Sequence, residues 1–305
     1  MSTDHYAVLA GPSDVSKHYA EKLAGRLGLE SYSVGHKVFP DGESYIRIPE
    51  IREQHVILVH NLDPPQDKRL WELFLELDKL RVMGKHVSLI TPYLAYSRQD
   101  KEFLPGEAVS VELLLRLARS LGAEEFYTVE VHKPESLLHF GGRALSLDPY
   151  PYMAGVLSDL LPHPSEVLVL SPDLGAIDRA RRFADAYGSE YDYIVKRRDR
   201  VTGEVQMEPK TIPVKDRSVV IVDDIISTGG TVAKAARMLL EQGAADVYAL
   251  AAHGLLVGGA VDKLRRSGVR EIIVGDTLPR VDGVVYVELY PVVVRVFEWL
   301  GEQEG

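Results

Sequence analysis

The sequence contains no cysteine, so disulfide bonds, thiolate catalysis and cysteine-ligated zinc or iron–sulfur sites are excluded. No apolar run approaches the roughly 20 residues that a membrane-spanning helix needs. The first residues also lack the basic and apolar segments of a signal peptide. These absences indicate a soluble protein, and we expect it to be cytoplasmic.

Basic residues are in the minority. Lys and Arg together number 35 against 45 Asp and Glu, which gives a net charge of −10. A chain this acidic is a poor general binder of polyanions, so we expect neither a nucleic-acid partner nor an anionic membrane surface as a partner. Any phosphate group that the protein binds must therefore be held by particular loops and a few placed cations.

The pattern of apolar residues predicts the fold class. Apolar runs, beginning at 6–10, alternate with segments of helical period, the first of which starts at Ser13 or Asp14 and stops at Gly28. Such alternation predicts an α/β protein with mainly parallel sheets flanked by helices. Further strands are predicted at 55–60, 87–91, 126–131, 167–171, 191–195, 218–222, 247–252, 271–274 and 284–288, and further helices at 68–82, 111–121, 176–187, 231–242, 258–267 and 291–300.

The length of 305 residues suggests two domains, since a typical domain has roughly 150 residues. Pro149 and Pro151 interrupt the pattern between the halves. We predict an N-terminal domain at 1–147 and a C-terminal domain at 148–290, with a final helix at 291–301 that packs back on the first domain. Ligands of parallel sheets bind beyond the carboxyl ends of the strands, so the loops there are the candidate sites.

The segment after the strand predicted at 218–222 is the most informative motif. Two carboxylates, Asp223 and Asp224, are followed by hydroxyl residues, a pair of glycines and a helix. A glycine turn at a helix N-terminus can direct backbone N–H groups at a phosphate, whereas carboxylates suit sugar hydroxyls or Mg²⁺. The alternative is an ordinary strand-to-helix turn that binds no ligand and whose hydroxyl groups cap the helix. The residues of the expected cradle are Ser227, Thr228, Gly229, Gly230 and Thr231.

This motif resembles the ribose-5-phosphate loop of the phosphoribosyltransferase superfamily. The resemblance implies that Asp223 and Asp224 hold the ribose hydroxyls, and that residues 227–231 hold the 5-phosphate. It also implies two phosphoribosyltransferase-type domains, of which the second carries this loop.

Five further motifs fall where strand ends or turns are expected. They are Phe39-Pro40-Asp41-Gly42-Glu43, the segment Pro92–Asp100 with Arg98 and Gln99, His132 at a strand end, Ser171-Pro172-Asp173-Leu174-Gly175, and the basic run Lys196-Arg197-Arg198. Taken singly, each has an ordinary explanation: turn chemistry at Asp41 and Glu43, a surface ion pair at Arg98, packing at His132, and a solvated hairpin at 196–200. Arg179, Arg181 and Arg182, at helical spacing, are expected to be solvated.

Six motifs in one order over essentially the whole chain resemble the ribose-phosphate diphosphokinases, or phosphoribosyl pyrophosphate synthetases. These enzymes transfer the diphosphoryl group of MgATP to the anomeric hydroxyl of ribose 5-phosphate. The resemblance implies the following roles: Phe39, Asp41, Glu43, Arg98 and Gln99 contact ATP, His132 and Asp173 contact Mg²⁺, and Lys196 and Arg198, with His132, serve catalysis. It also implies a homo-oligomer in which a neighbouring subunit supplies the adenine contacts at 39–43.

One segment departs from the family. After Asp100 many members carry a basic stretch that contributes to a regulatory site for phosphate and ADP, whereas here residues 101–107 contain one Lys and two Glu. We therefore expect no regulatory anion site in this loop.

Two other functions fit part of the sequence. A phosphoribosyltransferase that consumes phosphoribosyl pyrophosphate would explain residues 223–231, but it leaves the motifs at 39–43, 98–100 and 196–198 without a role. A non-catalytic regulatory subunit of the synthetase would usually have lost catalytic residues, whereas Lys196 and Arg198 are intact.

Overall fold

The computed structural model describes residues 5–194, 196–198, 205–207 and 212–298. At 196–198 and 205–207 it describes the course of the backbone but not the side chains. The chain forms two compact units, Met1–Asp148 with Leu289–Gly305, and Pro149–Glu288. The assignment of two phosphoribosyltransferase-like domains at 1–147 and 148–290 stays a prediction.

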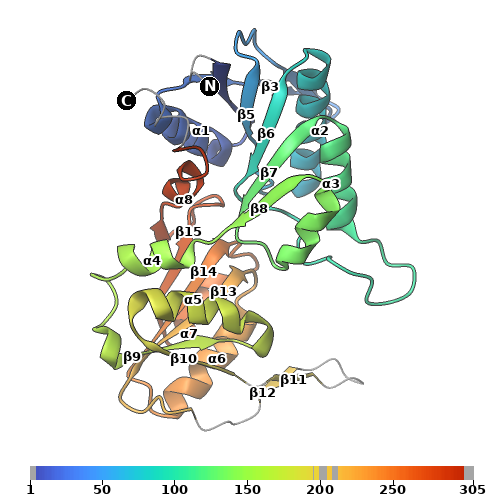
Figure 1. Cartoon of the computed structure of the whole chain (residues 1–305). Coiled ribbons are helices and arrows are strands. Elements are labelled where there is room, and N and C mark those ends of the chain that lie inside the picture. The colour runs from blue at the N-terminus through green and yellow to red at the C-terminus, as the bar shows by residue number, and fades with distance from the viewer. Residues whose placement is uncertain (1–4, 195, 199–204, 208–211, 299–305) are drawn as a thin grey trace. The chain divides into compact units, whose positions relative to one another are not determined.

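The first unit is built on a six-stranded sheet in which every neighbouring pair of strands is parallel (Figure 1). Its central strands are apolar and almost wholly buried, as a sheet covered on both faces requires. In spatial order the strands are β2 (Glu30–Ser33), β1 (Tyr6–Ala10), β5 (His55–Val59), β6 (His86–Thr91), β7 (Ala123–Val129) and β8 (Arg143–Leu147).

Helices cover both faces of this sheet. Helix α1 (Asp14–Leu27) packs on β1 and also against α8 (Tyr290–Val294), whereas α2 (Gln66–Val82) and α3 (Ser110–Ser120) pack together over β6 and β7 (Figure 1). The N-cap of α1 is Ser13, whose side chain accepts a hydrogen bond from Ser16 N, and Gly28 ends the helix in the left-handed conformation. Helix α8 also contacts β7.

The second unit repeats the architecture with a second parallel six-stranded sheet. Its strands in spatial order are β10 (Glu190–Tyr193), β9 (Val167–Ser171), β13 (Ser218–Ile226), β14 (Asp246–Gly254), β15 (Val269–Gly275) and β16 (Val285–Val287). Helices α4 (Tyr150–Val156) and α5 (Ile177–Tyr187) pack together, with α5 on β9 and β13, and α6 (Gly230–Glu241) and α7 (Ala260–Arg266) pack together with contacts to β14 and β15.

Apolar side chains between the sheet and α6 and α7 form the core of the second unit, with Ile221, Leu239, Ala249 and Leu264 among them. Each fully buried Leu or Ile side chain contributes about 1.5–3 kcal/mol. This core continues to Ile226 at the carboxyl end of β13, so the loop that follows β13 starts from a well-packed residue.

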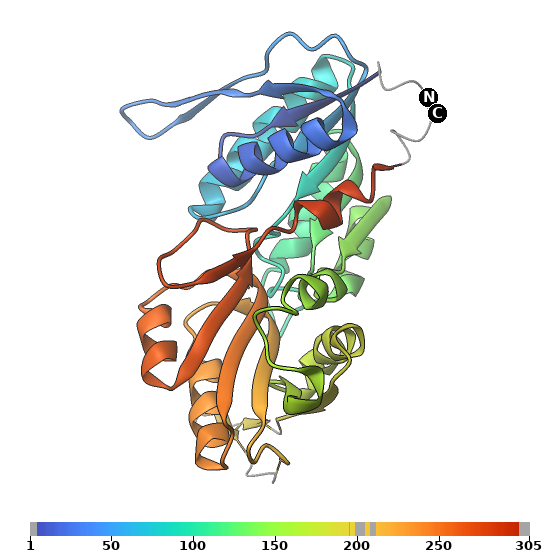
Figure 2. The same ribbon diagram turned by 90° about the vertical axis from the view of Figure 1, so that its left-hand side faces the viewer.

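Two antiparallel ribbons stand apart from the sheets. One is β3 (Gly35–Val38) with β4 (Ser44–Arg47), the long projecting hairpin of the first unit in Figure 2, and the other is β11 (Lys196–Arg198) with β12 (Val205–Met207). Three short 3₁₀ helices, η2 (Pro134–Phe140), η3 (Pro164–Glu166) and η4 (Leu174–Ala176), complete the described elements.

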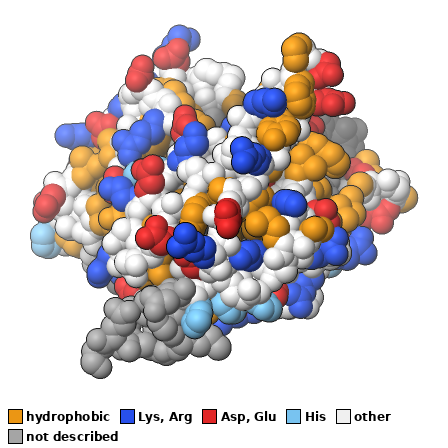
Figure 3. Space-filling view, turned by 90° about the horizontal axis from the view of Figure 1, so that it is seen from above, with side chains coloured by type: hydrophobic (Ala, Val, Ile, Leu, Met, Phe, Trp, Pro, Cys, Tyr) orange, Lys and Arg blue, Asp and Glu red, His pale blue; other side chains and the backbone are white. Residues whose placement is uncertain are grey.

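The predicted α/β class with two mainly parallel sheets is confirmed. The patterns did not predict β2, β8 or the β3–β4 ribbon. These strands are exposed or half-exposed along most of their length, so they carry no buried apolar run. None of the described helices is long and apolar enough to cross a membrane. On the face shown in Figure 3, acidic and basic side chains are interspersed rather than gathered by sign.

Candidate active site

The two carboxylates of the main motif lie within a strand. We predicted that the strand ends at Val222, but β13 continues to Ile226 because its backbone pairs with β14 as far as Ile226 opposite Gly254. Asp223 is half-buried and Asp224 is buried. Both side chains therefore project from the paired backbone of a strand rather than from a loop.

The glycine turn that follows has the geometry of an anion cradle. Gly229 takes the left-handed conformation at φ 69° and is the N-cap of α6. Two residues that follow β14 bind the carbonyl groups of this turn. Val257 N donates to Ser227 O at 3.0 Å, and Lys263 Nζ donates to Thr228 O at 2.7 Å. The first N–H groups of a helix have no partner within the helix, so they and the helix dipole favour an anion at this end of α6.

The two carboxylates perturb each other. Burial, together with the neighbouring charge of Asp224, raises the pKa of Asp223 well above its ordinary value. The carboxylate of Asp223 also accepts a hydrogen bond from Asp224 N at 2.9 Å. Such a shift is expected where two acidic groups are kept close for binding rather than for stability.

Arg179 contributes to this pair, and our prediction that it is solvated is wrong. Its guanidinium lies 3.7 Å from Asp224 Oδ2, and the two side chains are only 8% and 7% exposed. Arg179 comes from α5, which packs on β13, so the packing of helix on strand brings the cation to the acid. Arg181, in contrast, is exposed and pairs with Asp178 and Asp185 on its own helix.

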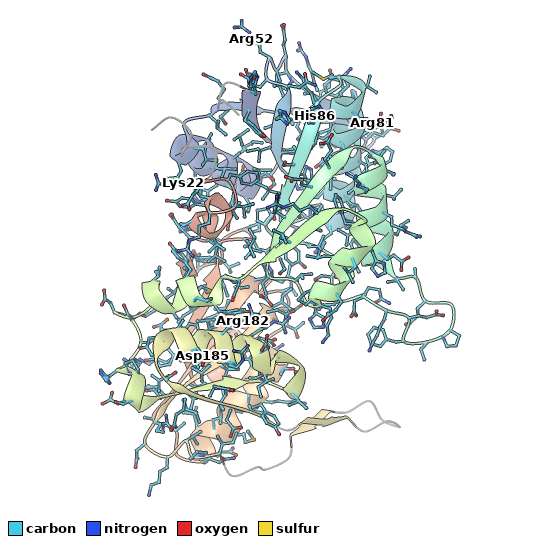
Figure 4. All side chains as sticks on the ribbon, viewed as in Figure 1. Lys22, Arg52, Arg81, His86, Arg182 and Asp185 are labelled. Atoms are coloured by element: carbon cyan, nitrogen blue, oxygen red, sulfur yellow. The ribbon has the colours of Figure 1, made fainter. Side chains whose placement is uncertain are left out.

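Tyr150 supports the same strand from α4. Its hydroxyl donates to Asp223 O at 3.0 Å. Arg182 of α5, labelled in Figure 4, places its guanidinium 5.1 Å from the centroid of the Tyr150 ring. Neither contact was visible in the sequence, because each joins residues far apart in the chain or on different helices.

Asp173 lies in the loop after β9, the strand beside β13. Its Oδ1 accepts a hydrogen bond from Ala176 N at 3.1 Å, which caps η4, and η4 contacts β13. The structure therefore brings the Asp173 loop and the carboxyl end of β13 to the same edge of the second sheet.

Lys196 and Arg198 form β11, whose backbone pairs with β12 between Lys196 and Met207 and between Arg198 and Val205. Their side chains, and residues 199–204, lie outside what the structure describes. Their predicted role stays a prediction.

In the first unit, Phe39, Asp41 and Glu43 form the turn of the β3–β4 hairpin. Phe39 N donates to Glu43 O at 2.8 Å, and Glu43 N donates to Asp41 Oδ1 at 3.2 Å. The Phe39 side chain is 39% exposed and lies under the ammonium group of Lys37, 4.8 Å from the ring centroid. An exposed aromatic ring on a well-formed turn is available to stack on a planar ligand.

Arg98 and Gln99 lie in the loop after β6. This loop is bent at Tyr96, which has φ 64°, and Gln99 N donates to Tyr96 O at 2.9 Å. The Tyr96 hydroxyl donates to the Asp67 carboxylate. A left-handed residue that is not glycine is strained, and such strain concentrates at functional loops.

His132 follows the neighbouring strand β7 and is half-buried. Two residues earlier, the buried Glu130 has φ 28°, a further strained position, and its N–H donates to Leu147 O at 2.9 Å. The loops of Arg98 and of His132 thus share one edge of the first sheet, since β6 and β7 are adjacent.

A divalent cation would need ligands beyond these side chains. No group of three or more His, Asp or Glu suited to a metal exists among the described residues. The carboxylate of Asp173 and the imidazole of His132 are single donors, and Mg²⁺ prefers six oxygen ligands. The donors present fit a metal ion that arrives with phosphate oxygens of its own.

The parallel α/β units and the acidic pair ahead of a glycine turn at a helix N-terminus are the features of a phosphoribosyltransferase-type fold. Residues 8–122 match the family model for the N-terminal domain of ribose phosphate pyrophosphokinase, and residues 206–287 match the phosphoribosyl synthetase-associated domain. A crystal structure of phosphoribosylpyrophosphate synthetase from Mycobacterium smegmatis is similar with a TM-score of 0.85 and 26% identity, over 98% of this chain and 99% of that one.

Curated relatives are more similar in sequence. The ribose-phosphate pyrophosphokinase of Saccharolobus solfataricus is 46% identical over 85% of this chain and 89% of its own length. That of Sulfurisphaera tokodaii is 43% identical over 90% and 95%. The chain belongs to the ribose-phosphate pyrophosphokinase family, and the resemblance inferred from its motifs is confirmed.

Proposed function

We propose that this protein transfers the β,γ-diphosphoryl group of MgATP to the anomeric hydroxyl of ribose 5-phosphate, giving phosphoribosyl pyrophosphate and AMP. One observation carries the proposal: the acidic pair on β13, half-buried Asp223 and buried Asp224, is followed within a few residues by the left-handed glycine turn at the start of α6. Family membership favours synthesis of phosphoribosyl pyrophosphate over its consumption, and catalysis over a purely regulatory role.

Ribose 5-phosphate needs two kinds of contact, and the second unit offers both. Two adjacent ribose hydroxyls are hydrogen-bond donors, and Asp223 and Asp224 supply carboxylate acceptors on a rigid strand. The 5-phosphate suits the N–H groups at residues 227–231. Binding at both ends fixes the orientation of the sugar, which is the main contribution that a protein makes to phosphoryl transfer.

ATP contacts are proposed for the first unit. Phe39 stacks on adenine, Asp41 and Glu43 meet its polar edge, and Arg98 and Gln99 hold phosphate and ribose. Arg98 is suited to phosphate because its planar guanidinium binds two oxygens at once. Mg²⁺ arrives as part of MgATP, where it neutralises phosphate charge, and His132 and Asp173 are the proposed protein contacts.

Lys196 and Arg198 are the proposed cations for the transition state. Negative charge grows on the oxygens around the β-phosphorus as the diphosphoryl group moves, and placed cations stabilise that charge. We expect Lys196→Ala to lower kcat by about 10²–10³-fold, because one such donor is typically worth that factor. The KM for ribose 5-phosphate should change little.

The reaction is tested by measuring AMP release from MgATP and ribose 5-phosphate without any nucleobase. Formation of AMP and phosphoribosyl pyrophosphate in equal amounts supports the proposal, and absence of AMP overturns it. Lys234→Ala, at an exposed position on α6, is the matched control for Lys196→Ala. Equal turnover in Lys196→Ala and in this control would contradict the proposed role of Lys196 in the transition state.

Residues 101–107 support the expectation that phosphate does not activate the enzyme through this loop. Phe103 N and Leu104 N donate to Glu107 Oε2 at 2.9 and 3.0 Å, and Gly106 N donates to the Glu102 carboxylate. The loop therefore satisfies its backbone donors with its own acids. Titration of phosphate and ADP into the AMP assay tests this, and strong activation by phosphate would contradict it.

The adenine contacts are proposed to act in the site of a neighbouring subunit of a homo-oligomer. A mixture of Phe39→Ala and Asp224→Asn proteins tests this arrangement. If the hairpin serves the neighbour, mixed oligomers regain activity that neither variant has alone, and if it serves its own subunit they do not. We propose that the enzyme acts in the cytoplasm, where ATP is available.

A further inference from the structure

One buried carboxylate holds the β3–β4 hairpin to the first unit. Glu72 of α2 is wholly buried, and its Oε1 accepts hydrogen bonds from His36 Nε2 and from Ser44 Oγ, both at 2.8 Å. His36 belongs to β3 and Ser44 to β4. A single oxygen atom therefore fastens both strands of the hairpin to α2.

The hairpin has few other means of fixing its direction. All four residues of β3 are exposed, and the residues of β4 alternate between exposed and half-buried. A ribbon of two strands without a buried apolar face is not stable on its own. Its orientation therefore depends on contacts at its base, where Val34 and Ile48 are buried and Glu72 makes two polar contacts.

The second oxygen of Glu72 continues the contact. Oε2 accepts a hydrogen bond from Arg69 NH1 at 2.9 Å, and Arg69 Nε lies 3.7 Å from Asp63 Oδ2. Asn61 joins this chain on one side by donating to Asp63 Oδ1 at 3.1 Å, and on the other by accepting from Tyr93 N at 2.7 Å. Tyr93 is the second residue of the segment Pro92–Asp100, which carries Arg98 and Gln99.

The negative charge of Glu72 is stabilised by these contacts. Burial alone would raise the pKa of Glu72, but the hydrogen bonds from Ser44, Arg69 and His36 and the charge of Arg69 outweigh burial and hold that pKa below its ordinary value. Glu72 is therefore ionised at neutral pH, and its bonds are the stronger, charge-assisted kind.

We propose that Glu72 and Arg69 are positioning residues for ATP. They hold the turn at 39–43 and the loop at 92–100 in fixed directions through one polar network, without themselves touching the nucleotide. This inference rests on the proposed function, since it takes those two segments as the ATP contacts.

Glu72→Gln tests the role of the carboxylate. Glutamine keeps the shape but removes the charge and replaces one acceptor oxygen by a donor. We expect the KM for MgATP to rise about tenfold, with the KM for ribose 5-phosphate within about twofold of the parent value. Asp78→Asn is the matched control, because Asp78 lies on the same helix in an exposed pair with Arg81, and it should change neither KM.

Hydrogen exchange of the amides at 35–47 gives a readout that does not depend on activity. Exchange there should accelerate in Glu72→Gln and stay unchanged in Asp78→Asn. Ser44→Ala removes one of the bonds to Glu72 but leaves the buried charge paired with Arg69. Ser44→Ala should show the same changes in KM and in exchange at smaller amplitude. It replaces Glu72→Gln as the test variant if Glu72→Gln does not fold.

The outcomes separate the possible failures. Faster exchange at 35–47 with an unchanged KM for MgATP overturns the positioning role, and so does an equal rise in both KM values. Unchanged exchange overturns the anchoring of the hairpin. If the parent protein forms no AMP, the proposed function fails and the ATP role fails with it, whereas the exchange data still decide whether Glu72 anchors the hairpin.

Discussion

Replacing Arg179 by Met removes the cation from the buried pair with Asp224 and keeps a long apolar side chain in its place. The two groups are 3.7 Å apart, and neither side chain is more than 8% exposed. Removal of one partner from such a pair weakens the electrostatic compensation of the other buried charge. Here that charge is Asp224, next to the carboxyl of Asp223, whose pKa is already raised.

The distance sets the size of the effect. At 3.7 Å and an effective dielectric constant of about 20, the attraction between unit charges is about 4.5 kcal/mol. Breaking a buried pair typically costs about 3–5 kcal/mol, so we expect Arg179→Met to lose about 3 kcal/mol of unfolding free energy. Asp224→Asn in the same chain should restore most of that loss, which corresponds to a coupling energy of about 2–4 kcal/mol.

Urea unfolding of the parent, both single variants and the double variant at pH 7 gives the coupling energy directly. Arg181→Met is the control, because Arg181 lies on the same helix in exposed pairs, and exposed pairs are worth about 1 kcal/mol or less. A coupling energy below about 0.5 kcal/mol would refute the reasoning. So would a loss in Arg179→Met no larger than in the control.

Two further predictions concern the proposed ribose-5-phosphate site at 223–231. Gly229→Ala should raise the KM for ribose 5-phosphate about tenfold, since a left-handed residue other than glycine costs about 1–2 kcal/mol and the new Cβ would meet Leu264 Cγ at 3.1 Å. Gly25→Ala, on α1 with open space at the Cβ position, should leave that KM unchanged. Asp223→Asn should lose turnover by about 10²-fold yet be more stable than the parent at pH 7. A group whose pKa is raised by folding loses stability as pH rises from its unfolded value of about 3.9 through the folded value, so the difference should shrink on acidification to about pH 4. Urea unfolding across that range measures it, and equal stability of parent and variant at pH 7 would contradict the raised pKa.

The central strands and most helices were predictable because burial leaves a periodic record in the sequence. Strands such as β1 and β9 are apolar at every position, or nearly so, and α1 starts and stops at Ser13 and Gly28 as its pattern indicates. The edge strand β2 carries no such record, since its residues are exposed or half-buried. Such strands are defined by their neighbours rather than by their own composition.

The candidate site was predictable only to the level of motifs. Asp223, Asp224 and the turn at 227–231 are contiguous, so their chemistry can be inferred from their order. The contacts that hold them are not contiguous: Arg179 looks like one of several solvated arginines until α5 is packed on β13. Glu72 likewise looks like an ordinary helix residue, since its partner His36 lies 36 positions away.

The two units have the same strand order, and each carries its antiparallel ribbon between the second and third sheet strands along the chain. Strand by strand, β1 corresponds to β9, β2 to β10 and β5 to β13. The turn after β5 then corresponds to the turn after β13, but it has the buried side chains of Asn61 and Asp63 and two prolines in place of a glycine pair. At the position where the second unit has Gly229 and Gly230, the first has Pro64 and Pro65, so the same place in the architecture carries different turns in the two units. The ribbons differ in the same way: that of the first unit has the Phe39 turn, and that of the second begins with Lys196-Arg197-Arg198.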